Sequence, residues 1–365
     1  MKVGIIGAGQ LGRMLALAGY PLGIEPLFLD RTADTPGGQV GPIITGDFAD
    51  SAKTIELAER VDIVTFDWEN VPSATLAQLP AHKVRPCARA LEISQDRVSE
   101  KALFHALGIP TPDFAEVDSR ADLERAVTAI GLPAVLKTRR LGYDGKGQAV
   151  LRKTADIEPG WRKLAGNPLV LEAFVPFERE VSLIGVRGAD GAIAFYPLTE
   201  NVHTGGILRY SRAPYRSPAL QRLAQRHVRR VLGNLGYVGV LALEFFVVRG
   251  RLIANEMAPR VHNSGHWTIE GAATSQFENH LRAICGLELG ATRARGPCAM
   301  INFIGKLPQL AGALHEPDLH FHDYGKSPRP GRKLGHCTLL APTATSRDAR
   351  LARLLRKFRR EGAEL

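Results

Sequence analysis

The stretch from Glu244 to Trp267, EFFVVRGRLIANEMAPRVHNSGHW, constrains the fold more strongly than any other part of the chain. Two runs rich in β-branched and aromatic residues flank Arg249-Gly250-Arg251, a pattern that predicts a β-hairpin with a tight glycine turn. If the loop consists of these three residues, Glu244 lies directly opposite Glu256, with Cβ atoms about 5 Å apart. Two carboxylates at that distance repel each other, so this pairing predicts a positive charge between them.

The acids of this hairpin form a candidate metal site. Glu244, Glu256 and the amide of Asn255 offer the hard oxygen donors that Mg²⁺ prefers. The alternative is a solvated hairpin whose acids face water, because a strand sequence does not determine its register. Polar residues crowd the segment after the second strand and favour a site: they are Arg260, His262, Asn263, Ser264 and His266.

Length and composition describe an ordinary globular protein. A chain of 365 residues predicts two or three domains, and 45% hydrophobic and 23% charged residues are typical of a soluble protein. The N-terminal apolar run is too short for a signal peptide, and no stretch approaches the ~20 apolar residues of a membrane helix. We therefore expect a cytoplasmic protein without a membrane partner. The four cysteines are far apart, which predicts neither a zinc site nor a disulfide framework.

The net charge of +10 suits either a nucleic-acid binder or an enzyme that handles anionic small molecules. Much of the excess lies between positions 350 and 360, where Leu351, Leu354, Leu355 and Phe358 follow a helical period. This pattern predicts the solvated face of a terminal helix. No nucleic-acid-binding motif accompanies the charge, so we expect no nucleic-acid partner. Three histidines, His315, His320 and His322, are spaced irregularly and are predicted to be exposed to solvent.

The N-terminal region predicts a Rossmann-like unit. A strand from Lys2 to Ile6 precedes a G-x-G-x-x-G loop at positions 7–12, and Asp30 ends the next strand. The motif alone indicates NAD, but physically it requires only a tight turn and a helix N-terminus that accepts a phosphate of any kind. A helix at 52–60 and a strand at 62–66 follow, and Glu69 lies after that strand, where open α/β sheets bind ligands.

A glycine-rich hairpin loop follows in the middle of the chain. Ser94 is predicted to cap a helix that ends near Gly108, and Lys137 ends a buried strand that leads into the loop at 139–148. Glycines allow such a loop to fold over phosphates, whereas the alternative is a flexible basic hairpin tip. Glu172 and Glu180 lie at strand ends further on.

The order of these features resembles the ATP-grasp enzymes, and more closely the N5-carboxyaminoimidazole ribonucleotide synthetases of purine biosynthesis. The segments that carry the resemblance include GAGQLGRM, DWENVP, VLKTRRLGYDGKGQ, FEREVSLIGVR, NEMAPRVHNSGHW and YGKSPRPGRKLGH. The resemblance implies an α/β and α+β fold with three parts: a Rossmann-like domain at 1–92, an ATP-grasp domain at 93–290 with a lid at about 112–175, and a small C-terminal domain at 291–365. A homodimer is also implied.

The resemblance assigns roles to residues of this chain. ATP and its Mg²⁺ are expected at Arg97, Lys137, Gly142, Tyr143, Asp144, Gly145, Lys146, Gly147, Gln148, Glu172, Val175, Glu180, His203, Glu244, Asn255 and Glu256, with Glu244 and Glu256 as the metal ligands. The aminoimidazole ribonucleotide and bicarbonate are expected at Gln10, Leu11, Glu69, Tyr143, Asp144, Arg260, His262, Asn263, Ser264, Lys326, Arg332 and Lys333. Asp144, Arg260 and Lys326 are expected to be catalytic, with Asp144 as general base toward the substrate amine.

The implied reaction is the ATP-dependent carboxylation of 5-aminoimidazole ribonucleotide by way of carboxyphosphate, and either this intermediate or CO₂ released from it is captured by the exocyclic amine. That intermediate hydrolyses readily, so the glycine loop is expected to act as a lid that excludes water. Under this interpretation the G-x-G-x-x-G loop receives a substrate phosphate. A NAD-dependent dehydrogenase would explain only the first thirty residues, and a nucleic-acid-binding protein would explain only the charge.

Overall fold

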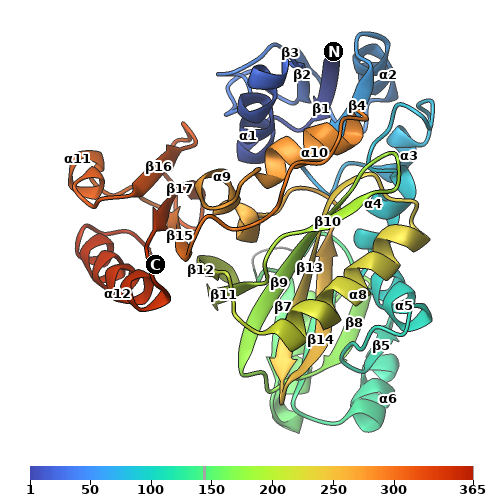
Figure 1. The fold of residues 1–365 in the computed structure, drawn as a ribbon. Coiled ribbons are helices and arrows are strands. Elements are labelled where there is room, and N and C mark those ends of the chain that lie inside the picture. The colour runs from blue at the N-terminus through green and yellow to red at the C-terminus, as the bar shows by residue number, and fades with distance from the viewer. Residues whose placement is uncertain (143–144, 365) are drawn as a thin grey trace.

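The computed structural model describes residues 1–142 and 145–364, and these residues form three sheets (Figure 1). The N-terminal sheet is parallel with the order β3-β2-β1-β4, which confirms the predicted Rossmann-like unit. Asp50 caps the second helix by accepting hydrogen bonds from the amides of Ala52 and Lys53. The elements are β1 (Lys2–Ile6), α1 (Gln10–Gly19), β2 (Glu25–Asp30), β3 (Ile43–Thr45), α2 (Ser51–Glu59), β4 (Ile63–Phe66), α3 (Ser73–Leu76) and α4 (Ala88–Ser94).

The second sheet is antiparallel with the order β5-β8-β6-β7, and helices α6 and α7 bury their apolar faces against it. This compact lobe occupies the stretch in which the lid was predicted. Its elements, with the helix that precedes it, are α5 (Arg97–Ala106), β5 (Phe114–Val117), α6 (Arg120–Ile130), β6 (Ala134–Thr138), β7 (Gln148–Leu151), α7 (Ile157–Leu164) and β8 (Leu169–Ala173).

The predicted start of helix α5 was wrong. Ser94 ends the preceding helix, because its hydroxyl donates a hydrogen bond back to the carbonyl of Leu91 at 2.9 Å. Asp96 caps α5 instead, and its carboxylate accepts a hydrogen bond from the amide of Val98 at 3.0 Å. The two helices therefore meet at a corner between Ser94 and Asp96.

The third sheet is the largest, and its strands lie in the second half of the chain, from Arg179 to Leu340. Its order is β14-β13-β9-β11-β12-β15-β17-β16, with β10 paired to β9. The C-terminal strands thus extend the same sheet, because β12 pairs with β15. The elements are β9 (Arg179–Arg187), β10 (Ile193–Phe195), β11 (Thr199–Thr204), β12 (Ile207–Ala213), α8 (Pro218–Asn234), β13 (Gly239–Val248), β14 (Arg251–Ala258), α9 (Thr268–Gly271), α10 (Gln276–Ile284), β15 (Cys298–Ile304), α11 (Leu310–Leu314), β16 (Leu319–Asp323), β17 (Lys333–Leu340) and α12 (Ala344–Arg360).

The predicted hairpin forms from β13 and β14, and Glu244 does lie opposite Glu256. The predicted three-residue loop was wrong, however. Val248 pairs with Arg251, so the turn contains only Arg249 and Gly250, whose φ angles of 48° and 75° suit a two-residue hairpin turn. A β-bulge compensates for the shorter loop, because the register shifts by one residue between Phe245 and Glu244.

Helix α10 joins the N-terminal unit to the large sheet. Its Phe277 and Leu281 belong to one buried cluster with residues of β1 and β13. The imidazole of His280 makes a 2.9 Å hydrogen bond with Thr65 on β4 and accepts another from the amide of Val240 on β13. The core is therefore continuous between these two parts, which holds the end of β4 close to the hairpin.

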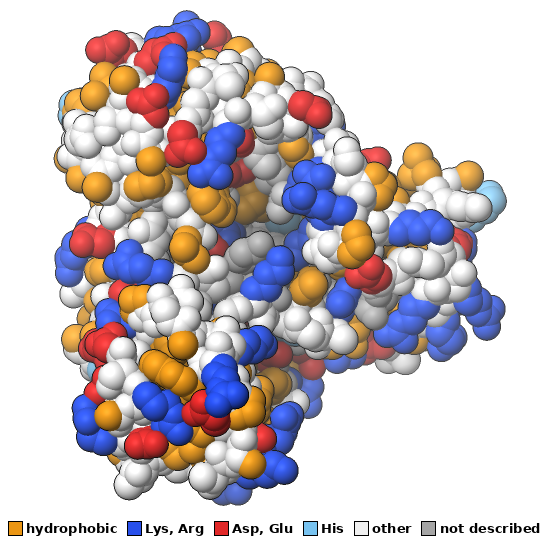
Figure 2. All heavy atoms as spheres, turned by 180° about the vertical axis from the view of Figure 1, so that it is seen from behind, with side chains coloured by type: hydrophobic (Ala, Val, Ile, Leu, Met, Phe, Trp, Pro, Cys, Tyr) orange, Lys and Arg blue, Asp and Glu red, His pale blue; other side chains and the backbone are white. Residues whose placement is uncertain are grey.

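The C-terminal helix α12 has the predicted two faces. Leu351, Leu354 and Phe358 are buried, and four of its basic side chains are exposed at positions 353, 356, 359 and 360. In Figure 2 lysine and arginine side chains gather on this projecting part of the molecule. Among the described residues, no helix combines the length and the apolar composition needed to cross a bilayer.

Candidate active site

A cavity of about 700 Å³ lies where the three sheets meet. Its wall includes the loop after β1, the end of β4, the start of α5, the hairpin acids and the segment before β17. Lysine and arginine side chains surround the hollow in Figure 2. The predicted site residues that line this cavity are Gln10, Leu11, Glu69, Arg97, Gly142, His203, Glu244, Glu256, Arg260, His262, Asn263, Lys326 and Lys333.

Other predicted residues are not among those that line this cavity. They are Lys137, Gly145, Lys146, Gly147, Gln148, Glu172, Val175, Glu180, Asn255, Ser264 and Arg332. Tyr143 and Asp144 are outside the described residues. Several lining residues had not been predicted, and the most consequential are Asp30, Asp67 and Arg329.

The amides of the glycine loop are occupied by acids of the same domain. The N–H groups of Gly9 and Gly12 donate to one oxygen of Asp67 at 2.8 and 3.0 Å, and the N–H of Ala8 donates to Asp30 at 2.7 Å. A Cβ atom at Gly7, where φ is +96°, would lie 1.8 Å from the Asp67 carboxylate, so only glycine fits there. Burial raises the pKa of Asp67 to about 6. In this structure these three amides are bonded to carboxylates, so a phosphate would have to displace Asp30 or Asp67, and the predicted phosphate-binding role of the loop stays a prediction.

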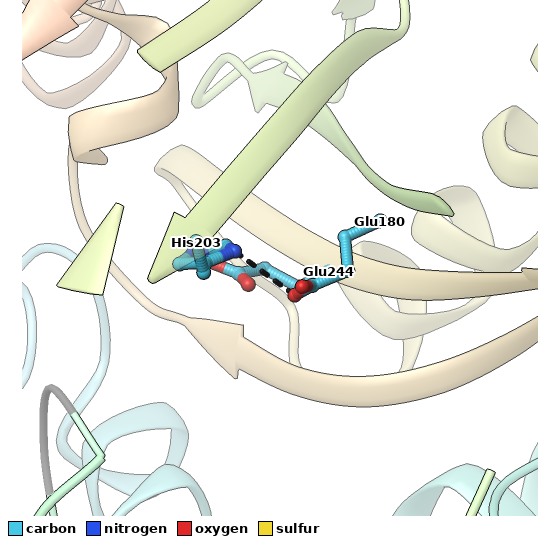
Figure 3. Close-up of side chains that lie close together, drawn as sticks. All are labelled: Glu180, His203 and Glu244. Carbon is cyan, nitrogen blue, oxygen red and sulfur yellow. Dashed lines mark ion pairs between the residues drawn. The ribbon is translucent and has the colours of Figure 1, made fainter. Parts of the chain in front are cut away.

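Four side chains of the large sheet converge at the hairpin end of the cavity. Figure 3 shows Glu180 of β9, His203 of β11 and Glu244 of β13 pointing toward one another. Their ligand atoms all lie within 4.8 Å of one another, and His203 Nδ1 is 3.0 Å from a Glu180 oxygen. Burial opposes the charged form of His203, but the bond to Glu180 and the charge of Glu244 raise its pKa. The fourth, Glu256 of β14, pairs with Arg97 at 3.1 Å.

Glu244 has a second histidine partner, His262. His262 Nε2 lies 3.1 Å from a Glu244 oxygen. Although burial opposes ionisation, this contact lowers the pKa of Glu244 to about 2. The donor set fits Mg²⁺, since Glu244 and Glu256 offer carboxylate oxygens from directly opposed backbone positions at the cavity wall.

His262 is held by a chain of buried hydroxyl and amide groups. Its Nδ1 is 2.8 Å from the Ser264 hydroxyl, which accepts a hydrogen bond from Ser182 at 2.7 Å. The chain continues from Ser182 to Asn201 at 3.0 Å and from Asn201 to Ser211 at 2.8 Å. Ser264 is fully buried, so in this structure it orients His262 and does not face the cavity. The residues of this hydrogen-bonded chain that lie on β9, β11 and β12 were not predicted, because no local sequence pattern marks them.

A buried ionic cluster underlies the lid lobe. Lys137 and Lys101 contact the two oxygens of Glu172 at 2.8 and 3.3 Å, and the Lys101 and Glu172 side chains are 0% and 2% exposed. Although burial opposes ionisation, the two ammonium groups lower the pKa of Glu172 to about 2. Burial also lowers the pKa of Lys137. Lys101 was not among the predicted residues.

The opposite wall carries the cations expected to meet the substrate. Arg260 pairs with Glu69, and the Lys326 ammonium contacts the Gln10 side chain, so residues from both ends of the chain meet. Burial, together with the nearby charge of Arg332, lowers the pKa of Lys326 to about 8.

One histidine prediction was wrong. His315 and His320 are exposed as predicted, but His322 is partly buried. Its Nε2 lies 2.6 Å from a Glu270 oxygen, and its ring stacks on His336 with centroids 4.3 Å apart. The acidic partner comes from α9, 52 residues away, so the local spacing of the histidines gave no sign of it.

Family models match almost the whole chain. The ribonucleotide synthetase preATP-grasp domain matches residues 1–95, the ATP-grasp domain matches residues 102–277, and the phosphoribosylaminoimidazole carboxylase C-terminal domain matches residues 298–350.

Relatives of known identity match over nearly their full length. The chain is 55% identical to N5-carboxyaminoimidazole ribonucleotide synthase of Pseudomonas aeruginosa, with 96% of this chain and 98% of the relative covered. The corresponding enzyme of Bacillus subtilis is 39% identical, with 93% and 91% covered.

Solved structures agree with these matches. The crystal structure of the synthetase from Thermus thermophilus superimposes with a TM-score of 0.92 at 52% identity and covers 97% of this chain and 98% of its own. The Aspergillus clavatus enzyme in complex with ADP and 5-aminoimidazole ribonucleotide gives 0.91 at 31% identity, with 98% of both chains covered. The chain is therefore an ATP-grasp ligase that belongs to the N5-carboxyaminoimidazole ribonucleotide synthase family.

Proposed function

We propose that the chain catalyses the ATP-dependent carboxylation of 5-aminoimidazole ribonucleotide with bicarbonate, which yields N5-carboxyaminoimidazole ribonucleotide, ADP and phosphate. The observation that carries this proposal is a single cavity with hairpin acids on one wall and Arg260, Lys326 and Lys333 on another. This arrangement suits a nucleotide triphosphate that meets an anionic acceptor. The Aspergillus clavatus relative, solved with both ADP and the aminoimidazole ribonucleotide, supports it.

On the ATP side, Arg97 and Lys137 are the proposed cations, and Glu172, Val175, Glu180, His203 and the loop at 142–148 are the remaining contacts. Glu244 and Glu256 would hold Mg²⁺, which neutralises charge on the phosphates, and Asn255 lies beside them. Gly145 of the loop lies against the turn between β11 and β12, since a Cβ there would be 2.7 Å from the Gly205 carbonyl oxygen. A lid that excludes water requires a contact of this kind across the cavity mouth.

On the acceptor side, two bonds form in sequence. An oxygen of bicarbonate attacks the γ-phosphorus of ATP, ADP leaves, and carboxyphosphate is formed. The exocyclic amine of the ribonucleotide then attacks the carboxyl carbon, phosphate leaves, and the nitrogen loses a proton to a base. Asp144 is the proposed base, and Arg260 and Lys326 are the proposed cations that hold the anions in line.

The remaining proposed substrate contacts are Gln10, Leu11, Glu69, Tyr143, His262, Asn263, Ser264, Arg332 and Lys333. Ser264 would act through His262, to which its hydroxyl is bonded.

A coupled assay of ADP formation tests the proposal directly. With Mg²⁺, ATP and bicarbonate present, ADP formation should depend on added aminoimidazole ribonucleotide, and no such dependence would contradict the proposed reaction. NADH is not expected to bind, and the protein should not enhance its fluorescence, because Asp30 and Asp67 occupy the loop amides that a dinucleotide would need.

Lys326 should impose an alkaline limit on substrate capture. Its pKa of about 8 means that the ammonium is charged below pH 8 and neutral above it. We expect kcat/KM for the ribonucleotide to fall above pH 8 by about tenfold per pH unit. The Lys326→Arg variant keeps its charge and should move this limb to higher pH. An unchanged limb in that variant would assign the titration to another group.

The homodimer and the cytoplasmic location are further parts of the proposal, and both rest on the family resemblance. Sedimentation velocity at micromolar concentration tests the first, with a single monomeric species as the contradicting result.

A further inference from the structure

The bulge in the hairpin decides on which face Glu256 lies. From the turn inward the pairs run without interruption from Val248 and Arg251 to Phe245 and Ala254, and the next pair is Glu244 and Glu256. Asn255 is thus the extra residue.

Strand side chains alternate between faces, so one residue more or less reverses every later position. Without the bulge, Glu244 would face Asn255, and Glu256 would pair with Leu243, whose side chain is fully buried. The bulge is therefore what places both carboxylates on one face.

The first two turns of α5 hold the backbone on both sides of Glu256, which follows this extra residue. The amide of Met257 donates to a Glu100 oxygen at 2.7 Å, and the Lys101 ammonium donates to the carbonyl of Asn255 at 3.3 Å. Residues in a bulge lose partners in the sheet, so their backbone groups need partners from elsewhere. Arg97, one turn earlier, contacts the Glu256 side chain itself.

The two side chains that bind this backbone are buried: Glu100 is 2% exposed and Lys101 is 0% exposed. Burying a carboxylate and an ammonium is costly unless each is hydrogen-bonded. Glu100 accepts its hydrogen bond from the amide of Met257, and Lys101 joins the bulge at Asn255 to Glu172. Two buried side chains, the Glu100 carboxyl group and the Lys101 ammonium, thus act on the backbone that flanks Glu256.

We propose that Glu100 and Lys101 are positioning residues, which hold the bulge at Asn255 so that Glu244 and Glu256 share one face. This inference rests on the proposed function, because it takes these two acids as the ligands of Mg²⁺. Neither Glu100 nor Lys101 is assigned a direct role in the chemistry.

Three substitutions at position 100 separate the effect of side-chain length from the effect of the carboxyl group. Glu100→Gln removes the ionisable carboxyl group but keeps an oxygen that reaches the Met257 amide. Glu100→Asp keeps the carboxyl group but is one methylene too short, and Glu100→Met keeps the size without an acceptor. Ser99→Ala, at an exposed position on the same helical turn, is the matched control.

The primary measurement is Mn²⁺ binding to the ADP complex, followed by electron paramagnetic resonance. We expect Glu100→Asp and Glu100→Met to weaken Mn²⁺ binding by about 10- to 100-fold, which is typical when a residue that supports a ligand is lost. The Glu100→Gln and Ser99→Ala variants should retain wild-type affinity. A purely structural role would lower the melting temperature without changing the metal affinity.

Two results would overturn the inference. One is wild-type Mn²⁺ affinity in Glu100→Asp, and the other is a loss in Glu100→Gln as large as in Glu100→Met, which would indicate a role for the ionisable carboxyl group.

A crystal structure of the Glu100→Asp variant tests the inference without depending on catalytic activity. The inference predicts a displaced bulge, and an unchanged pairing of Glu244 with Glu256 contradicts it. Failure of the proposed function can be distinguished from failure of this inference. In the first case the wild-type protein would show no ribonucleotide-dependent turnover, although substitutions at position 100 would still displace the bulge.

Discussion

The Glu256→Gln variant should lose turnover, with kcat reduced on the order of 10³-fold, while the fold stays intact. Glutamine has nearly the same size, so the substitution opens no cavity, and the change is the loss of one negative charge at the proposed metal site. Glu256 is 41% exposed and pairs with Arg97, so this ion pair contributes little to stability. Steady-state ADP formation at saturating Mg²⁺ measures the effect.

The control for this experiment is Glu59→Gln, at an exposed position on α2 that is not among the cavity-lining residues. It should behave as the wild-type protein does. Near-normal activity of Glu256→Gln with an unchanged melting temperature would contradict the assignment of Glu256 as a metal ligand.

The largest effect on stability should come from Glu172→Gln. Its carboxylate is the shared partner of Lys101 and Lys137, and removing one member of a buried ion pair typically costs about 3–5 kcal/mol of unfolding free energy. Urea denaturation followed by circular dichroism measures this loss. Glu116→Gln removes the partner of Arg139 at a side chain that is 53% exposed, and it should cost at most about 1 kcal/mol.

The same carboxylate predicts how stability changes with pH. Since the pKa of Glu172 is lowered from 4.5 to about 2 in the folded protein, its contribution is present above pH 4.5 and is lost as the pH falls toward 2. The Glu172→Gln variant should therefore lose less stability than the wild-type protein over that range. Equal losses in both proteins would exclude Glu172 as the source.

Local sequence patterns were sufficient for several helices and strands. The period of apolar residues predicted α12, and β-branched runs predicted β1, β6, β13 and β14, because each of these signals depends on neighbours in the chain. The helix start at Asp96 was missed, since Ser94 and Asp96 are both good capping residues and only the packing of α4 decides between them.

The pairing of Glu244 with Glu256 was predicted correctly, but from an incorrect loop length. A shorter turn and a bulge of one residue compensate for each other. Turn preference is a local property, whereas the bulge is bonded by Glu100 and Lys101 about 155 residues away in sequence. No pattern within the hairpin contains that information.

The sequence by itself determined the family, the order of the elements and the identity of the hairpin acids, because motifs and periodicity are properties of consecutive residues. Only the tertiary structure decided which groups those motifs meet. The glycine loop meets Asp30 and Asp67, His262 meets the hydroxyl chain that begins at Ser264, and His322 meets Glu270. Each partner lies on another element, so its position follows from how the sheets and helices pack, and a one-residue shift in register would replace it with a different side chain.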